Sequence, residues 1–320
     1  MNIIVTGSAG FIGFSLCRDL LKDKKNKIFG IDNINSYYSK KLKKKRLQIL
    51  KKNKNFKFIY TDINYYKKIL KYLKNIKIDY IFHFAAQAGV RYTRQNPGSY
   101  IRSNINGFKN FSKVVLAKKP KKFIFASSSS VYGDAKAYPV KESFKLKPKN
   151  LYARTKKNNE DFAKKFFKKS NIKIIGLRLF TIYGEWGRPD MLIFKFLKTA
   201  DTKKVFELNN KGEMYRDFTY IISAIKLIKT VMQQKNSKNY EIFNICSSKP
   251  QKISTIVKYL QRKTKFKKVK FVSMNNLEVF KTYGSNNKLM KTMRLNFKFK
   301  DFKKGIISTY NWYNRYRHLI

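Results

Sequence analysis

Short apolar runs alternate with lysine-rich amphipathic stretches along the first half of the chain. The runs are rich in β-branched and aromatic residues, as strands are, and they read NIIVTG, KIFGID, FKFIYTD, IDYIFHFAA, KKFIFASSS and IKIIGLRLF. The stretches between them have the spacing of helices. Strands and helices in alternation predict βαβ units, an α/β fold and a mainly parallel, doubly wound sheet.

The alternation becomes irregular after about residue 180, and the stretch YGEWGRPD at 183–190 begins a second, smaller region. We find no internal repeat and no low-complexity linker. The pattern therefore predicts a first region over 1–180 and a smaller α/β region over 181–320 that is partly interleaved with it.

Composition narrows the class of protein. The chain has 320 residues, 43% of them hydrophobic, which suits a folded protein with a substantial core. Cys17 and Cys246 are far apart and form no CxxC pair, so we expect two buried structural thiols. His83 and His318 are too few for a metal cluster or a Ser-His-Asp triad. The apolar runs are too short for a membrane span, and the default expectation is a cytoplasmic enzyme or binding protein.

The charge is high, because 73 lysines and arginines stand against 18 acids, a formal net charge of +55. The basic residues are spread along the chain, as in KKLKKKR at 40–46, KKFFKKS at 164–170 and KTKFKKVK at 263–270. Lys, Asn, Ile, Phe and Tyr all have codons rich in A and T, so a genomic bias explains the charge better than a binding stripe. We therefore expect no specific nucleic-acid partner, but faster encounter with anionic substrates.

The stretch VTGSAGFIG carries the first chemical signature. Gly7 and Gly10 allow a tight turn and a close approach to a pyrophosphate, and Gly13 allows close helix packing, in the strand-turn-helix context that this role requires. Asp32 ends the next strand, where it can accept hydrogen bonds from a ribose diol and repel a 2′-phosphate. The pattern predicts a Rossmann-type fold that binds NAD rather than NADP. Asp62 follows the third strand and either reaches the adenine or caps a helix.

The stretch YARTK places Tyr152 and Lys156 on one helix face at i and i+4. A phenol must lose about 3 pKa units, or about 4 kcal/mol, to act as a base near neutrality. The Lys156 ammonium and a positive nicotinamide supply that shift. With GxxGxxG spacing, this pair resembles the extended short-chain dehydrogenases. The predicted cofactor-site residues are Gly7, Gly10, Phe11, Ile12, Gly13, Asp32, Asp62, Ile63, Ala85, Ala86, Tyr152 and Lys156.

Four serines follow the apolar run FIFA, in SSSSVYGD at 127–134. The resemblance selects Ser128, four residues before the tyrosine of VYG. It implies that Ser128 hydrogen-bonds the hydroxyl that is oxidised in a sugar substrate and helps to carry its proton to Tyr152. We predict that Ser129 and Ser130 orient a sugar carboxylate and that Ser127 is structural. The alternative is that Ser129 and Ser130 only satisfy backbone groups at the strand end.

Longer landmarks make the resemblance narrower. HFAAQAGVR, ASSSSVYG, LYARTKKNNE, LRLFTIYGEWGRPDM and RDFTYI together resemble the UDP-glucuronate 4-epimerases over nearly the whole chain. The resemblance implies a homodimer that converts UDP-glucuronate to UDP-galacturonate through a 4-keto intermediate. It places Arg216 on the diphosphate and Thr181 and Arg188 at the sugar carboxylate. Arg91 is expected near the nucleotide or sugar, with a structural ion pair as the alternative.

Some positions depart from the family pattern. Ile222 and Ser223 replace acids, Ser285 replaces an Asp and Cys246 replaces a Gly. We expect Ser223 to cap the following helix, which makes its loss of charge structural. These departures bear on the nucleotide side of the C-terminal region and leave the hydride chemistry intact.

Related activities are the alternatives. A UDP-glucuronate decarboxylase or a 4,6-dehydratase shares the fold, NAD and the keto intermediate, but such relatives carry acids where this chain has Ser129 and Ser130. A UDP-glucose/galactose 4-epimerase also remains open. A non-catalytic NAD-binding protein could lose Ser128, Tyr152 and Lys156 without penalty, yet all three are present.

Overall fold

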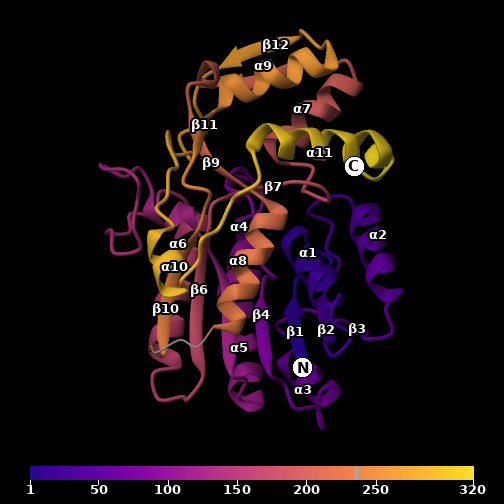
Figure 1. Ribbon diagram of the computed structural model, residues 1–320, viewed down its shortest axis with the longest axis vertical. Helices are drawn as coiled ribbons and strands as arrows, with labels where there is room; N and C mark the ends of the chain where they lie inside the picture. The colour runs from indigo at the N-terminus through magenta and orange to yellow at the C-terminus, as the bar shows by residue number, and fades with distance from the viewer. Residues whose placement is uncertain (235–237) are drawn as a thin grey trace.

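A seven-stranded sheet forms the centre of the computed structural model, which describes residues 1–234 and 238–320. Its order is β10-β6-β5-β4-β1-β2-β3, and every neighbouring pair is parallel. The predicted α/β fold with a parallel sheet is therefore confirmed (Figure 1). The strands are β1 (Asn2–Thr6), β2 (Lys27–Asp32), β3 (Phe56–Tyr60), β4 (Tyr80–His83), β5 (Lys122–Ser128), β6 (Lys173–Leu179) and β10 (Tyr240–Ile245).

Each face of the sheet has its own hydrophobic core. Ile3 and Val5 of β1 point into one core, and Ile4 between them points into the other. A strand that is buried on both faces needs apolar residues at every position, which explains the continuous runs in the sequence. One core includes α1 (Phe11–Leu20), α2 (Lys40–Lys51) and α8 (Ile221–Gln233), and the other includes α3 (Tyr66–Tyr72), α5 (Gly107–Lys118) and α6 (Leu151–Phe166).

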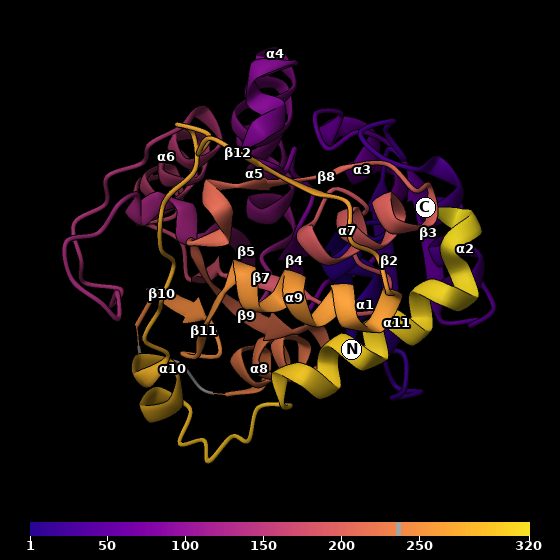
Figure 2. The ribbon, with the colours of Figure 1, turned by 90° about the horizontal axis from the view of Figure 1, so that it is seen from above.

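A smaller region lies beyond the carboxyl ends of the central strands (Figures 1 and 2). It contains a three-stranded sheet and a two-stranded sheet with helices around them. Strand β10 comes from the second half of the chain but pairs with β6 at the edge of the central sheet. The elements of this region are β7 (Thr181–Tyr183), β8 (Phe206–Asn209), β9 (Tyr215–Tyr220), β11 (Pro250–Lys252), β12 (Val269–Val272), α7 (Leu192–Asp201), α9 (Ile253–Thr264) and α11 (Phe302–Tyr316).

Two short helices complete the fold. Helix α4 (Pro97–Tyr100) leads through a π-helical turn, Ile101–Asn106, into α5. Helix α10 (Asn287–Thr292) packs beside β10. Both lie outside the alternating pattern that the apolar runs predict.

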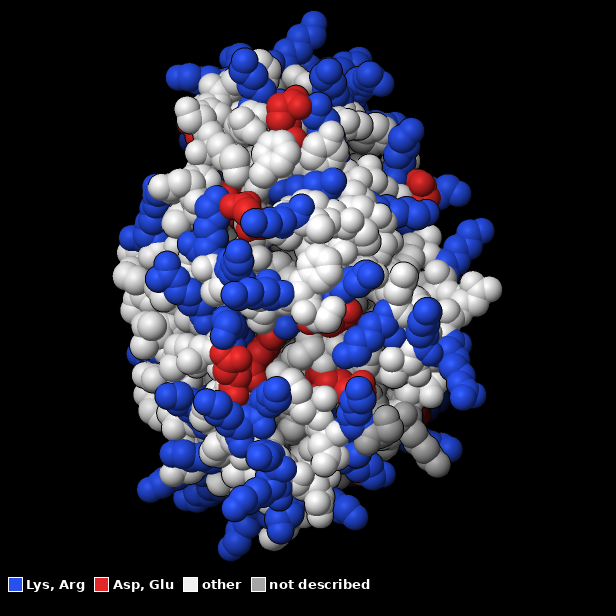
Figure 3. Space-filling view, turned by 90° about the vertical axis from the view of Figure 1, so that its left-hand side faces the viewer, with Lys and Arg blue, Asp and Glu red and all other residues white. Residues whose placement is uncertain are grey.

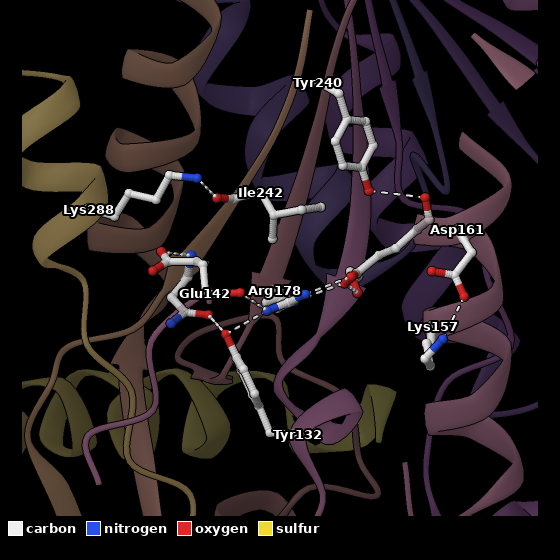
Figure 4. Close-up of polar contacts among 11 residues, drawn as sticks. Tyr132, Glu142, Lys157, Asp161, Arg178, Tyr240, Ile242 and Lys288 are labelled. Atoms are coloured by element: carbon white, nitrogen blue, oxygen red, sulfur yellow. Dashed lines mark hydrogen bonds and ion pairs between the residues drawn. The ribbon is translucent and has the colours of Figure 1, made fainter. Parts of the chain in front are cut away.

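A buried ion pair ties β5, β6 and α6 together. Glu160 on α6 accepts hydrogen bonds from Arg178 Nε at 3.0 Å and Nη2 at 2.8 Å, and from Ser127 Oγ at 2.5 Å. Arg178 Nη1 also donates to the Tyr132 hydroxyl at 2.9 Å, and that hydroxyl donates to Asn244 Oδ1 at 2.8 Å. Figure 4 shows Arg178 at the centre of this network, facing Tyr132. The network fixes the strand end that carries the serines to the helix that carries Tyr152.

Both cysteines are free and buried, as predicted. Burial raises the pKa of both thiols, which makes them poor nucleophiles. The expected role of Ser223 is wrong: it lies in the first turn of α8 rather than at its start, and its hydroxyl accepts a bond from Lys300 N at 3.4 Å. Over residues 1–234 and 238–320, no helix combines the length and apolar character of a membrane span, and no group of three His, Cys, Asp or Glu side chains could hold a metal ion.

The basic side chains cover the surface widely. Figure 3 shows Lys and Arg over all parts of one face, with acidic residues in a few places among them. They do not follow a single groove or stripe on that face. The compositional origin of the charge and the absence of a nucleic-acid partner remain predictions.

Candidate active site

A pocket of about 300 Å³ opens at the carboxyl ends of the central strands. Parallel α/β sheets bind ligands at this edge, where loops from neighbouring strands meet. Most of the residues predicted for the site line this pocket together. They are Gly7, Gly10, Phe11, Ile12, Gly13, Asp32, Asp62, Ile63, Ala85, Ala86, Ser128, Tyr152, Lys156, Thr181 and Arg188.

The glycine-rich loop requires glycine because its backbone has a positive φ at Gly7 and makes close backbone contacts at Gly7 and Gly13. Gly7 has φ +72°, and a Cβ added there would lie 2.8 Å from the backbone nitrogen of Ala85. A Cβ on Gly13 would lie 2.1 Å from the Gly7 carbonyl oxygen. The loop therefore packs tightly against the strand ends and opens directly into α1 at Phe11. Its bare backbone and the following helix N-terminus suit the diphosphate of a dinucleotide.

Two carboxylates stand at the adjoining strand ends. Asp32 accepts bonds from Ala9 N at 3.0 Å and Ile34 N at 2.8 Å, and burial still raises its pKa. Burial opposes ionisation of Asp62 too, but hydrogen bonds from Asn64 and Asn33 bring its pKa below the usual range. Asp62 does not cap α3, which starts at Tyr66, so that alternative is wrong. Both acids face the pocket, where they can receive hydroxyl or amino groups of a nucleoside.

Tyr152, Lys156 and Ser128 meet between β5 and α6. Tyr152 and Ser128 both line the pocket, and Lys156 Nζ lies 6.0 Å from the centre of the Tyr152 ring. Lys156 Nζ donates to the Ala126 carbonyl oxygen at 2.9 Å. Burial lowers the Lys156 pKa to about 8, while the charge of Glu160 acts in the opposite direction. Burial raises the pKa of Tyr152, although Ser128 and Arg188 partly oppose this. The protein groups alone thus leave Tyr152 protonated near neutral pH.

The four serines have different surroundings. Ser127 donates to Glu160, and both Ser127 and Ser128 line the pocket. Ser128 Oγ lies 2.9 Å from Ser130 Oγ and accepts a bond from Ser130 N at 3.2 Å. Ser129 and Ser130 begin a 3₁₀ turn, Ser129–Tyr132, and are not among the residues that line the pocket. Their role toward a carboxylate remains a prediction.

Thr181 and Arg188 also line the pocket. Arg188 donates from Nε to Asp190 Oδ1 at 2.9 Å and from Nη2 to Asp190 Oδ2 at 2.7 Å. The Tyr37 hydroxyl donates to the same Oδ2 at 3.0 Å. Sequence reasoning found Arg188 but missed Asp190 and Tyr37, although Asp190 stands within the quoted WGRPDM stretch.

The other two predicted arginines lie apart from these groups. Arg91 Nε is 2.5 Å from Glu278 Oε1, and Arg216 Nη2 is 3.3 Å from Glu278 Oε2. Arg91 is thus in an ion pair, which was the alternative to its ligand role. Neither arginine lines the pocket, so the prediction that Arg216 holds a diphosphate requires that it leave or share Glu278.

Two buried cations on α2 were hidden in the basic run KKLKKKR. Lys43 lines the pocket, and its Nζ donates to the Asn35 carbonyl oxygen at 2.8 Å. Arg46 is fully buried and donates to the Ala9 carbonyl oxygen at 2.8 Å and the Trp186 carbonyl oxygen at 2.5 Å. Arg46 therefore links the glycine-rich loop to the segment that carries Arg188. Periodicity was the available signal, because the two cations are spaced i, i+3 on the apolar face of α2.

The departures from the family pattern lie outside the pocket lining. Ser285 and Cys246 are buried, and Ser285 Oγ accepts a bond from Asn287 N at 3.3 Å. Ile222 is 46% exposed on α8. These three substitutions therefore do not alter the pocket walls.

Comparison with known proteins gives consistent matches. The model of the NAD dependent epimerase/dehydratase family matches residues 3–246. The chain is 44% identical to an uncharacterized protein, MJ1055, of Methanocaldococcus jannaschii, over 98% of this chain and 96% of that one. It is 34% identical to protein CapI of Staphylococcus aureus, over 99% of both chains.

Two further matches have named activities. UDP-glucuronate 4-epimerase 4 of Arabidopsis thaliana is 36% identical, over 83% of this chain and 64% of that protein. Among solved structures, the UDP-glucuronic acid 4-epimerase of Bacillus cereus, in complex with UDP-glucuronic acid and NAD, superposes with a TM-score of 0.91 at 30% identity. That match covers 98% of this chain and 99% of the other.

Proposed function

The chain belongs to the NAD dependent epimerase/dehydratase family, and from that premise we propose that it inverts C4 of the sugar in UDP-glucuronate to give UDP-galacturonate, with NAD as a tightly held cofactor. One observation carries the proposal. A single pocket is lined by a dinucleotide-type glycine loop and Asp32, by the group Ser128, Tyr152 and Lys156, and by Arg188. Solved relatives with this fold hold UDP-glucuronic acid and NAD.

The residues present fit NAD. A Cβ at Gly7 or Gly13 would clash with the backbone of Ala85 or Gly7, so glycine at both positions keeps the loop compact, and both glycines line the pocket. Asp32 has an ionisable carboxylate at the end of β2 for a ribose diol, and a 2′-phosphate there would meet its charge. Bound NAD would supply the acceptor for a hydride from C4 of the sugar and the donor for its return to the other face.

Tyr152 is the proton acceptor in this scheme. Ser128 hydrogen-bonds the C4 hydroxyl and passes its proton toward the Tyr152 oxygen, and the reverse path returns it. Lys156 keeps an ammonium on the same helix face as the phenol and stabilises the phenolate by opposite charge. Burial of Tyr152 works against ionisation, so the proposal assigns the positive charge of Lys156 to the phenolate, and oxidised nicotinamide would add to that charge when bound.

The uronate carboxylate needs restraint. Oxidation at C4 places a ketone β to that carboxylate, an arrangement that loses CO2 when the carboxylate is desolvated or free to turn. Thr181 and Arg188 are proposed to orient it, with Ser129 and Ser130 as neutral donors from the other side. Acids at those two serine positions would repel the carboxylate, which separates this chain from decarboxylase- and dehydratase-type patterns.

Incubation of the purified protein with UDP-glucuronate and no added cofactor tests the function. We expect UDP-galacturonate to form, with at most catalytic NAD required. Release of UDP-pentose and CO2 would identify a decarboxylase, and turnover of UDP-glucose but not UDP-glucuronate would identify a neutral-sugar epimerase. No conversion of any UDP-sugar by NAD-loaded protein would contradict the proposal.

We also propose that the protein is a homodimer of the cytoplasm that acts on free UDP-sugars and has no nucleic-acid partner. Light scattering on the purified chain measures the oligomeric state.

The role of Arg216 in diphosphate binding belongs to the same proposal. Arg216→Met should raise KM far more than it lowers kcat, since a diphosphate contact persists through the reaction.

A further inference from the structure

Arg188 is already paired with a carboxylate of its own chain. Asp190 takes two of its donors, Nε at 2.9 Å and Nη2 at 2.7 Å, in a fork. The two side chains are 23% and 37% exposed, and Arg188 lines the pocket. Nη1 is the guanidinium nitrogen that the fork leaves for other partners. The charge of Arg188 is therefore largely compensated before a substrate arrives.

Asp190 itself is held by Tyr37. The Tyr37 hydroxyl donates to Asp190 Oδ2 at 3.0 Å, from a residue 153 positions earlier in the chain. Gly89 leaves room for this hydroxyl, because a Cβ on Gly89 would lie 2.2 Å from it and the φ there is +93°. The Tyr37 ring also packs on Tyr92, with centroids 4.8 Å apart. The position of Asp190 is thus fixed from the loop that follows Asp32.

The proposed reaction makes two demands on Arg188. It must hold the uronate carboxylate, so that CO2 is not lost from the 4-keto sugar. The sugar ring must also rotate in the site between the two hydride transfers, so the carboxylate must be released from its first contact. An uncompensated guanidinium on a half-buried arginine would bind the carboxylate tightly and slow the rotation of the sugar.

We propose that Asp190, fixed by Tyr37, is a positioning residue. It weakens the binding of the sugar carboxylate by Arg188 and so permits the 4-keto sugar to rotate. This inference rests on the proposed uronate activity. Asp190 keeps the guanidinium plane fixed through Nε and Nη2, and it competes with the substrate for the same charge. The carboxylate then makes one exchangeable contact instead of a permanent ion pair.

The Asp190→Asn variant tests this inference, with Glu185→Gln as the matched control. Glu185 is an acid of the same segment that binds the Tyr220 hydroxyl at 2.6 Å and is remote from Arg188 in its contacts. For Asp190→Asn we expect UDP-glucuronate to bind about tenfold more tightly, as expected for removal of a competing charge beside an arginine, while kcat falls and reduced nicotinamide accumulates during turnover. Binding is measured by calorimetry on Tyr152→Phe backgrounds, where no reaction follows.

A purely structural role for Asp190 predicts the opposite sign, because a disordered Arg188 would bind the substrate more weakly. Weaker or unchanged binding in Asp190→Asn, with normal NAD content, would overturn the inference. Asp190→Glu should restore part of kcat, and Tyr37→Phe should shift binding and kcat in the same directions as Asp190→Asn but less. UDP-glucose, which lacks the carboxylate, should bind all variants alike. If the wild-type protein does not convert UDP-glucuronate at all, the proposed function fails first.

Discussion

At the scale of single residues, the environment of Tyr152 sets the first expectation. Burial holds this phenol protonated in the protein alone, and Ser128 partly opposes the rise in its pKa. Tyr152→Phe keeps the ring and removes the proton acceptor, so kcat should fall by about 10²–10⁴-fold while the affinity for UDP hardly changes. Steady-state kinetics and calorimetry with UDP measure the two effects. Near-normal turnover would assign the base to another group.

Lys156 gives a second expectation, concerning stability and pH. Its pKa is about 8 in the folded protein, against 10.5 for an ordinary lysine. Between these values the unfolded chain retains the proton that the folded protein has released, so the free energy of unfolding rises with pH. This residue should contribute a rise of about 3 kcal/mol across that window.

The comparison with Lys156→Met isolates that contribution. Urea unfolding at about pH 7.5 and about pH 10 should show wild-type protein gaining stability relative to the variant. Equal changes in both proteins would mean that the Lys156 pKa is not lowered by burial. Activity should fall as the pH rises over the same range, because deprotonation of Lys156 removes the charge that stabilises the phenolate.

Several site residues could be predicted because their sequence signals are local. The glycine loop, Asp32 and the Tyr152–Lys156 pair each depend on spacings of a few residues, which any sequence displays. Tyr37 and Asp190 could not be paired in this way, because 153 positions separate them and their contact depends on the packed fold. Arg46 was missed for a related reason, since a composition rich in surface lysine conceals one buried cation.

At the scale of elements, the Glu160–Arg178 pair holds the scaffold behind the site. Both side chains are only 5% exposed. Glu160→Gln leaves Arg178 with an uncompensated buried charge, and the free energy of unfolding should fall by about 3–5 kcal/mol. Denaturant unfolding gives the value.

The double variant Glu160→Met with Arg178→Met is the control for this effect. It removes both charges and replaces them with flexible apolar groups, so most of the lost stability should return. A double variant as unstable as Glu160→Gln would show that packing, not the unpaired charge, causes the loss. Figure 4 shows why coupling is expected, since Arg178 also contacts Tyr132.

The alternation of apolar runs predicted the elements of the central sheet better than those of the smaller region. Parallel strands that are buried on both faces have a continuous apolar pattern, and the helices between them have a regular one. The short strands β8, β11 and β12 have three or four residues each and mixed burial, so no period is established. The place of β10 in the central sheet depends on long-range pairing with β6, which local patterns do not contain.

At the scale of the whole molecule, the net charge of +55 concerns association more than fold. UDP-glucuronate carries charges on its diphosphate and its carboxylate, and a positive field should speed its approach. We expect kcat/KM to fall by up to about tenfold between low and physiological ionic strength, while kcat stays nearly constant. Initial rates over a series of salt concentrations measure this, with a matched series in a neutral osmolyte as control. A kcat/KM independent of salt would remove any steering role for the charge.

The return of β10 to the edge of the central sheet limits how this protein could be recombined. A fragment that stopped near residue 180 would keep the glycine loop, Tyr152 and Lys156, yet β6 would become an outer strand. Its five central residues are all buried in the intact chain, and an apolar edge with free N–H and C=O groups invites self-association. The cofactor-binding and substrate-binding regions of related chains therefore cannot be exchanged by a single junction near residue 180. New specificity in such a chain has to arise by changes of side chains in place.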